Sequence, residues 1–213
     1  MPTADCSQPL DEAGFVYPGD PPVAVDDHAT MAADGYRVAR LSVGTHAGTH
    51  VDAPAHTEPD GRTVDDFSVE RFRFDAALVD VDAAPRESVG ADRLAAADPP
   101  SDADLLAVRF GWSDRWEGPE YRDHPHLTRE AAAWCAERGY DVGLDTPNPD
   151  PTPPADGWDD DPGFPAHREL LGAGQLLVEN LVLENVPERF DLLTYPLSIP
   201  DGDAAPVRAV AEW

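Results

Sequence analysis

Three histidines and an aspartate fall within eleven residues, and their spacing limits how this part of the chain can fold. His46, His50, Asp52 and His56 all occupy even positions, so a fully extended strand would present them on one face. Four residues of strand nevertheless cover about 13 Å, whereas a zinc–nitrogen bond is only about 2.1 Å long. His46 and His50 can therefore meet at one ion only if the chain bends between them.

Glycine and proline stand where this segment needs to change direction. Gly44 and Gly48 can adopt backbone conformations that other residues avoid. Asp52 lies two residues after a histidine and can reach the same ion without a bend, whereas Pro54 directs His56 away from the strand. Imidazole with carboxylate and no thiolate is typical of zinc or manganese sites. The segment therefore predicts a metal centre, with His56 apart from the other donors.

A further histidine and a further carboxylate elsewhere in the chain are candidates to complete such a centre. His167 opens a predicted helix, and Glu179 ends the apolar run 175–178. A carboxylate at the end of a buried strand is costly unless a positive group meets it. Taken alone, this pair is explained equally well by ordinary packing. The remaining histidines stand among prolines, acids and turn residues and are predicted at the surface; they are His28, His124 and His126.

Short apolar runs and a few helical patterns predict the fold class. Units of strand and helix mix with consecutive strands, which favours an α/β (or α+β) fold with a mixed sheet over a doubly wound sheet. The length of 213 residues fits a single domain over residues 1–213. The predicted helices are Val89–Ala97, Thr128–Gly139 and Ala166–Leu171. The predicted strands are Tyr36–Val43, Ala77–Val81, Leu105–Phe110, Tyr140–Leu144, Gln175–Val178, Leu192–Ile199 and Pro206–Ala211.

Residues 146–165 form a long segment with seven prolines and five aspartates. A loop of this length without its own secondary structure is either functional or disordered. Because compact elements flank it on both sides, we predict a stiff, ordered loop, and its role stays open.

Charge and composition exclude several classes of function. The 42 acidic residues against 15 basic residues give a net charge of −27, and every basic residue is arginine. An acidic chain repels phosphate, which argues against nucleic-acid and anionic-membrane partners. No apolar run reaches the ~18 residues of a membrane span, and the first residues do not resemble a secretory signal. Without lysine, Schiff-base and P-loop lysine chemistry are excluded.

The many carboxylates, with arginine in place of lysine, favour a protein kept in concentrated salt. At molar salt the Debye length falls to roughly 3 Å, so that self-repulsion largely vanishes. An ordinary acidic protein from a GC-rich genome is the alternative. Cys6 and Cys135 are predicted to be free thiols, as in a reducing compartment. We therefore expect a cytoplasmic protein of a salt-loving organism.

The segment from His46 to His56 matches the pattern H-x-G-T-H-x-D-x-P-x-H at every fixed position. This pattern belongs to the cyclase family of metal-dependent hydrolases, which includes bacterial kynurenine formamidases, and the chain resembles this family along nearly its whole length. Tyr17 stands where those formamidases typically carry a substrate-stacking tryptophan, and Phe110 and Asn148 are further departures. The other matching stretches are Tyr17–Pro21, Val108–Trp112, Gly143–Pro147, His167–Leu171, Val178–Leu181 and Pro206–Ala209.

The resemblance implies a swivelling β/β/α domain, usually a homo-oligomer (dimer or tetramer), that holds two divalent metal ions. Zinc is the first expectation and manganese the second. His46 and His50 would bind one ion, and His167 would hold the other. Asp52 and Glu179 would bridge both ions. His56 would act as the general acid and base, and Tyr17 would contact the substrate. The implied ligand set is His46, His50, Asp52, His167 and Glu179.

The expected reaction is the hydrolysis of an aryl formamide, such as N-formylkynurenine in tryptophan catabolism, to formate and the free amine. Tyr17, Trp112 and Trp158 are candidates to flank an aromatic substrate, although ordinary packing explains the tryptophans equally well. Two alternatives stay open. The same site could hydrolyse an isatin-like lactam or an ester, or the chain could bind metal without catalysis. Structural zinc sites are usually rich in cysteine, which weighs against the last alternative.

Overall fold

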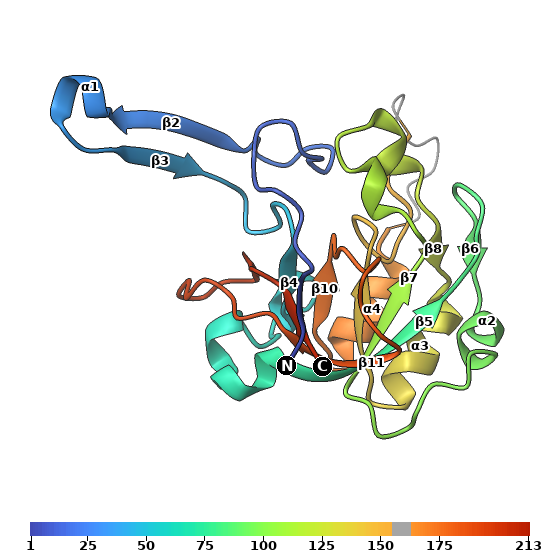
Figure 1. The fold of residues 1–213 in the computed structure, drawn as a ribbon. Coiled ribbons are helices and arrows are strands. Elements are labelled where there is room, and N and C mark those ends of the chain that lie inside the picture. Colours follow the sequence, from blue (N-terminus) through green and yellow to red (C-terminus); the bar gives the residue numbers. More distant parts are fainter. Residues whose placement is uncertain (155–162) are drawn as a thin grey trace.

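One mixed sheet of nine strands forms the body of the protein (Figure 1). The computed structural model describes residues 1–154 and 163–213. Four neighbouring strands, β5, β7, β9 and β10, run parallel, and the strands on either side of them pair antiparallel. This confirms the predicted α/β class with a mixed sheet. In spatial order the strands are β1 (Thr3–Asp5), β13 (Val210–Glu212), β11 (Arg189–Leu193), β5 (Arg73–Asp80), β7 (Leu105–Arg109), β9 (Asp141–Leu144), β10 (Leu177–Glu179), β4 (His50–Asp52) and β12 (Ala204–Pro206).

Three helices cover one face of this sheet: α2 (Ala91–Ala95), α3 (Arg129–Glu137) and α4 (Pro165–Gly172). Alternate residues of β7 separate the two faces, since Leu106 packs with the helices and Leu105 packs in a second core on the other side. That second core is built from strands, short 3-10 helices and loops. The central strands are therefore buried on both faces, which is why they appear in the sequence as continuous apolar runs.

Helix α3 shows how local sequence sets the ends of an element. Thr128 is the N-cap, and its hydroxyl accepts a hydrogen bond from the Ala131 N–H at 3.1 Å. Gly139, just after the helix, has φ +77°, a conformation that glycine adopts at little cost. The prediction of a helix capped by Thr128 and ended by Gly139 is confirmed.

The remaining elements are short and lie around the sheet. Strands β2 and β3 form a separate antiparallel hairpin, with α1 at its tip, that stands away from the body in Figure 1. Among the described residues, no helix is long and apolar enough to cross a membrane. These elements are β2 (Ala24–Ala29), α1 (Met31–Asp34), β3 (Val38–Ser42), β6 (Ser88–Val89), β8 (His126–Leu127) and the 3-10 helices Pro54–His56, Val64–Asp66, Val69–Phe72, Ser113–Arg115 and Pro119–Asp123.

Three predicted elements differ from the structure. The strand predicted over 206–211 is two strands, β12 at one edge of the sheet and β13 next to the opposite edge strand, β1. The strand predicted over 192–199 is β11, which begins at Arg189 because charged and apolar residues alternate along it and Arg189 pairs with Asp75. The helix predicted over 89–97 is only the short α2, since Val89 pairs in β6 with β8 instead. Strand β4 is not among the strands predicted from apolar runs, because two of its three residues are polar, and only the spacing of the metal donors indicated a strand there.

The histidines outside the 46–56 segment are less uniform than predicted. His28 is exposed on the hairpin, as expected, and His126 is half-buried beside Ser88. The surface prediction for His124 is wrong, because this side chain is only 1% exposed. Its ring nitrogens lie 2.7 Å from the Pro125 carbonyl and 2.9 Å from the Thr152 hydroxyl. The cysteine prediction is confirmed, since Cys6 and Cys135 are both buried free thiols.

Burial of His124 generates a testable pH dependence. Burial lowers the pKa of His124 from 6.5 to about 3, so the folded state excludes a proton that the unfolded chain takes up. The stabilising contribution of the neutral ring is therefore present above pH 6.5 and is lost as the pH falls toward about 3. Each pH unit in this window is worth at most about 1.4 kcal/mol.

Urea unfolding at constant salt between about pH 7 and pH 4.5 measures this contribution. The wild type should lose ~2 kcal/mol more than His124→Gln over that range. His28→Gln, at the exposed hairpin position, is the matched control and should follow the wild type. Equal pH slopes for the wild type and His124→Gln would contradict the prediction.

Candidate metal centre

Strand β4 carries two of the predicted donors into the middle of the protein. It lies between β10 and β12, and its antiparallel register with β10 pairs His50 with Glu179. The His50 Nε2 atom lies 3.1 Å from Glu179 Oε2 and 3.3 Å from Asp52 Oδ1. All three side chains are nearly or fully buried. Strand pairing therefore joins two residues that the sequence separates by more than half of its length.

The bend predicted between the first two histidines is present. Residues 45–49 form a turn before β4, and Gly48 has φ +64°. This turn brings His46 back toward the strand, so that its Nδ1 atom lies 2.9 Å from Asp52 Oδ1. The rings of His46 and His50 face each other edge to face at 5.1 Å. A straight strand could not place these two rings beside one carboxylate.

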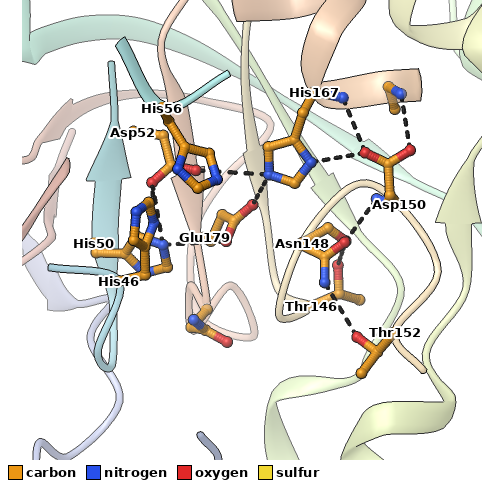
Figure 2. Close-up of polar contacts among 12 residues, drawn as sticks. His46, His50, Asp52, His56, Thr146, Asn148, Asp150, Thr152, His167 and Glu179 are labelled. Atoms are coloured by element: carbon orange, nitrogen blue, oxygen red, sulfur yellow. Dashed lines mark hydrogen bonds and ion pairs between the residues drawn. The ribbon is translucent and has the colours of Figure 1, made fainter. Parts of the chain in front are cut away.

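His167 approaches the same carboxylates from the other side (Figure 2). It lies in the first turn of α4, after Pro165 at the start of the helix. Its Nε2 atom is 3.3 Å from Glu179 Oε1 and 3.8 Å from Asp52 Oδ2. Each carboxylate thus directs one oxygen toward His50, with His46 also at Asp52, and the other oxygen toward His167.

Fixed oxygen acceptors orient the two most buried imidazoles. His50 Nδ1 lies 2.9 Å from the Gly48 carbonyl, and His167 Nδ1 lies 2.7 Å from Asp150 Oδ2. With one proton on Nδ1, each ring turns Nε2 toward the carboxylates, where this nitrogen can hold either a second proton or a metal ion. Asp150 also accepts hydrogen bonds from the Ala166 and His167 N–H groups at 2.8 and 3.0 Å. The start of the proline-rich segment therefore holds both α4 and its histidine.

The donor set fits a divalent cation. His50 Nε2, both oxygens of Asp52 and Glu179 Oε1 are buried and lack hydrogen-bond partners among the described residues. Uncompensated buried carboxylates are strongly destabilising unless a positive charge meets them. Nitrogen and oxygen donors without sulfur suit zinc or manganese. A bound cation would therefore complete the bonding of these atoms.

Donor atoms gather in two groups that share Asp52. One group is His50, Asp52 and Glu179, and the other is His46, Asp52 and His56, with the donor atoms of each group within 4.8 Å of one another. The prediction that His56 lies off the strand is confirmed, since it ends a 3-10 helix that starts at Pro54. The second group nevertheless brings His56 within donor range of the metal position.

The carboxylates also control the protonation of these rings. Burial lowers the pKa of His46, but Asp52 and Asp203 together raise it more, to about 9. Burial likewise opposes protonation of His167, yet Asp150 and Glu179 raise its pKa to about 10. The pKa of Asp52 is held well below its usual value, against its burial, by His46 and His50. Metal ions would compete with protons for these same nitrogens.

A cleft of about 620 Å³, which includes space open to solvent, leads to these donors. Phe15, Tyr17 and Phe164 line it together with His56 and other donors. The rings of Tyr17 and Phe164 are 6.5 Å apart, and Phe164 lies edge-on to His167 at 5.7 Å. The cleft therefore joins an aromatic wall to a polar floor.

The three aromatic residues that were candidates to flank a substrate differ in where they lie. Tyr17 lines the cleft. Trp112 is buried in the helix-side core, where its indole N–H donates to the Tyr121 carbonyl at 3.0 Å, which agrees with ordinary packing, the alternative left open for it. Trp158 lies outside the described residues.

Four residues at the site escaped prediction. Asp150 lies among prolines, which hides its role. Phe15 and Phe164 belong to no sequence motif, although Phe164 lies three residues before the predicted ligand His167. Asp203 precedes the short match near the end of the chain. Its Oδ2 atom lies 2.9 Å from His46 Nε2 and 3.5 Å from His56 Nδ1. Distance along the chain hid these residues, because the packing of loops and of β12 brings them to the site.

A mixed α/β sheet that gathers histidines around two buried carboxylates is the architecture of a metal-dependent hydrolase. The chain belongs to the cyclase family. The model of this family, described as "Putative cyclase", matches residues 4–151. It is 33% identical to a kynurenine formamidase of Bacillus cereus, over 97% of this chain and 95% of that protein. It is 36% identical to a kynurenine formamidase of Salinibacter ruber, over 99% of this chain and 97% of that protein.

Solved structures share the fold. Isatin hydrolase A from Ralstonia solanacearum superposes with a TM-score of 0.84 at 25% identity, over 99% of this chain and 91% of that one. A predicted metal-dependent hydrolase from Bacillus stearothermophilus superposes with a TM-score of 0.78 at 23% identity, over 99% of this chain and 97% of that one. The fold is thus shared along nearly the whole length of the chain.

The contacts of Asp150 predict a defect in metal binding. In Asp150→Asn the amide cannot accept all three hydrogen bonds from α4 and His167, so the His167 ring loses its orientation. Loss of such a partner typically weakens metal binding roughly 10–100-fold. Competition with a chromophoric chelator measures this affinity. Glu169→Gln, at a partly buried position of α4 whose carboxylate pairs with Arg129, is the control, and unchanged zinc affinity in Asp150→Asn would refute the prediction.

Proposed function

We propose that the chain is a metal-dependent hydrolase that cleaves an aryl formamide, such as N-formylkynurenine in tryptophan catabolism, to formate and the free amine. The observation that carries this proposal is the pair of buried carboxylates, Asp52 and Glu179, between opposed histidines at the floor of an aromatic-walled cleft. The full-length similarity to kynurenine formamidases supports it. The bond broken is a carbon–nitrogen bond other than a peptide bond.

Two divalent ions, zinc or alternatively manganese, are proposed to occupy the donor set. His46 and His50 would hold one ion, His167 would hold the other, and Asp52 and Glu179 would bridge them. When bound, such ions polarise a carbonyl oxygen and make a water molecule more acidic. The supporting observation is that each carboxylate directs its two oxygens to opposite histidine groups.

His56 is the proposed general acid and base. It lines the cleft, and its ring lies 4.1 Å from that of His46 and 5.5 Å from that of His167. It would take a proton from the attacking water and return it to the leaving nitrogen as the carbon–nitrogen bond breaks. An imidazole can both accept and donate a proton, which suits both roles. With no lysine in the chain, histidine is the natural residue for this step.

The aromatic wall is proposed to hold the aryl ring of the substrate. Phe15, Tyr17 and Phe164 line the cleft, and the rings of Tyr17 and Phe164 lie 6.5 Å apart. Flat apolar side chains favour an aromatic ligand through stacking and burial of area. Tyr17 would therefore set the position of the ring while the formyl group faces the floor.

A homo-oligomer, dimer or tetramer, is the proposed assembly, and the hairpin of β2 and β3 supports it. An isolated two-stranded hairpin is marginally stable in water, yet this hairpin stands away from the body (Figure 1). It also exposes large apolar side chains on both strands and at its tip: Val25, Met31, Tyr36, Val38 and Leu41. A second copy that covers this hairpin would bury them.

Turnover assays with zinc or manganese in molar KCl test the proposed reaction. Formanilide and N-formylkynurenine should release formate and the free amine faster than isatin is opened. Opening of isatin without cleavage of either formamide would replace the formamidase with a lactam hydrolase. Metal binding without turnover of any of these substrates, together with loss of the fold on chelation, would make the ions structural.

The role of His56 has a direct test. His56→Ala should lower kcat by roughly 10²–10⁴-fold, the usual contribution of a general acid and base, while the metal content stays at about two ions per chain. Elemental analysis alongside the formanilide assay measures both quantities. His28→Ala, which alters an exposed histidine, is the control. A fall in metal content instead of turnover would make His56 a ligand.

Residues 1–213 are proposed to work as one domain in the cytoplasm of a salt-loving organism. The net charge of −27 without lysine predicts that added salt stabilises the fold by screening self-repulsion. If screening contributes a few kcal/mol, the Tm should rise by ~10 °C between about 0.1 and 2 M KCl. Differential scanning calorimetry measures the shift, and NaCl should act equally. A Tm that is independent of salt would contradict the halophilic proposal.

A further inference from the structure

Asp203 is a carboxylate outside the proposed ligand set that touches two of the site histidines. It immediately precedes β12, and the backbone there is fixed against β4, because the Ala53 N–H donates to the Asp203 carbonyl at 2.9 Å. The next residue, Ala204, pairs with Asp52 in the sheet. The position of this side chain is therefore set by the same strand that carries the buried donors.

One oxygen of Asp203 serves both rings. Oδ2 lies 2.9 Å from His46 Nε2 and 3.5 Å from His56 Nδ1. The opposite nitrogen of His46, Nδ1, lies 2.9 Å from Asp52 Oδ1. His46 is thus held between a buried carboxylate on the metal side and Asp203 on the outer side. With the proton on Nε2 directed to Asp203, the Nδ1 lone pair faces the metal position.

Burial distinguishes Asp203 from the proposed ligands. Its side chain is 40% exposed, whereas that of Asp52 is fully buried. Asp203 is absent from both donor groups found among the described residues. Among the described residues, Asp203 is the carboxylate that forms an ion pair with His56. Its place therefore suits a residue that orients other groups.

We propose that Asp203 is a positioning residue that holds His46 as a metal ligand and turns His56 toward the substrate. The inference rests on the proposed function, since it gives these two histidines their roles. A negative acceptor on Nε2 of His46 fixes its tautomer and makes Nδ1 a better ligand. The same oxygen on Nδ1 of His56 leaves Nε2 as the nitrogen that exchanges protons with the substrate.

Two measurements on purified full-length protein test this inference. Zinc affinity is measured by competition with a chromophoric chelator, and kcat and KM are measured with formanilide at saturating zinc. Asp203→Ala should weaken zinc binding roughly 10–100-fold and lower kcat at least ~10-fold, with KM within about twofold. Asp203→Asn, which keeps the shape and one oxygen, should lie between Asp203→Ala and the wild type in both measurements. Asp201→Asn, in the preceding turn, should match the wild type.

The two readouts separate the possible failures. Unchanged zinc affinity in Asp203→Ala overturns the inference for His46, and unchanged kcat overturns it for His56. Loss of a whole ion at saturating zinc would make Asp203 a ligand and would also overturn it. Circular dichroism checks that each variant is folded, and Asp203→Asn retains the test if Asp203→Ala is not. Absence of formanilide turnover in the wild type would refute the proposed function while leaving the zinc measurement valid.

Discussion

The placement of two buried carboxylates side by side is the constraint on which this structure depends. Asp52 and Glu179 lie on neighbouring strands, and three of their four oxygens lack hydrogen-bond partners among the described residues. Like charges in a dry interior repel strongly. The imidazoles around them relieve this repulsion by taking up protons, and a divalent cation would relieve it better. The arrangement is stable only with such a compensating charge.

Other buried aspartates show what a purely structural carboxylate looks like here. Asp145 accepts hydrogen bonds from the N–H groups of residues 110–112 at 2.8–3.0 Å. Asp141 accepts one from the Leu176 N–H and pairs with Arg71, and Asp150 caps α4. Each of these carboxylates is satisfied by backbone donors or arginine. Asp52 has neither, although it is equally buried, and that contrast separates a ligand from a structural acid.

The sequence predicted the donors better than their arrangement. The 46–56 segment contains its own bend and residue types, so local geometry sufficed to predict that His46 and His50 converge at Gly48. The pairing of His50 with Glu179 depends instead on the register between β4 and β10, which no local pattern encodes. Strand β4 was indicated only by the spacing of the metal donors, since its polar residues break the apolar pattern that marks buried strands. Asp150 and Asp203 were missed because their contacts with His167 and His46 come from long-range packing, which no local pattern shows.

Asn180 connects the end of β10 to the turn that precedes β4. Asn180 follows Glu179 with φ +58°, a left-handed conformation that asparagine tolerates better than most residues. Its side-chain N–H donates to the Gly48 carbonyl at 2.8 Å, and its Oδ1 accepts from the Tyr121 hydroxyl at 2.9 Å. The same Gly48 carbonyl orients His50. One residue thus joins the end of β10 to the turn that bends His46 back.

The histidines differ in how firmly they are held, and the difference follows their depth. A backbone carbonyl within the same turn fixes His50, and a buried carboxylate that also caps a helix fixes His167. His46 and His56, nearer the cleft opening, depend on the half-exposed Asp203. A ligand gains from rigidity, because any reorientation costs metal affinity. A group that moves protons must instead meet both water and leaving amine, and the looser contact of His56 at the open side allows that.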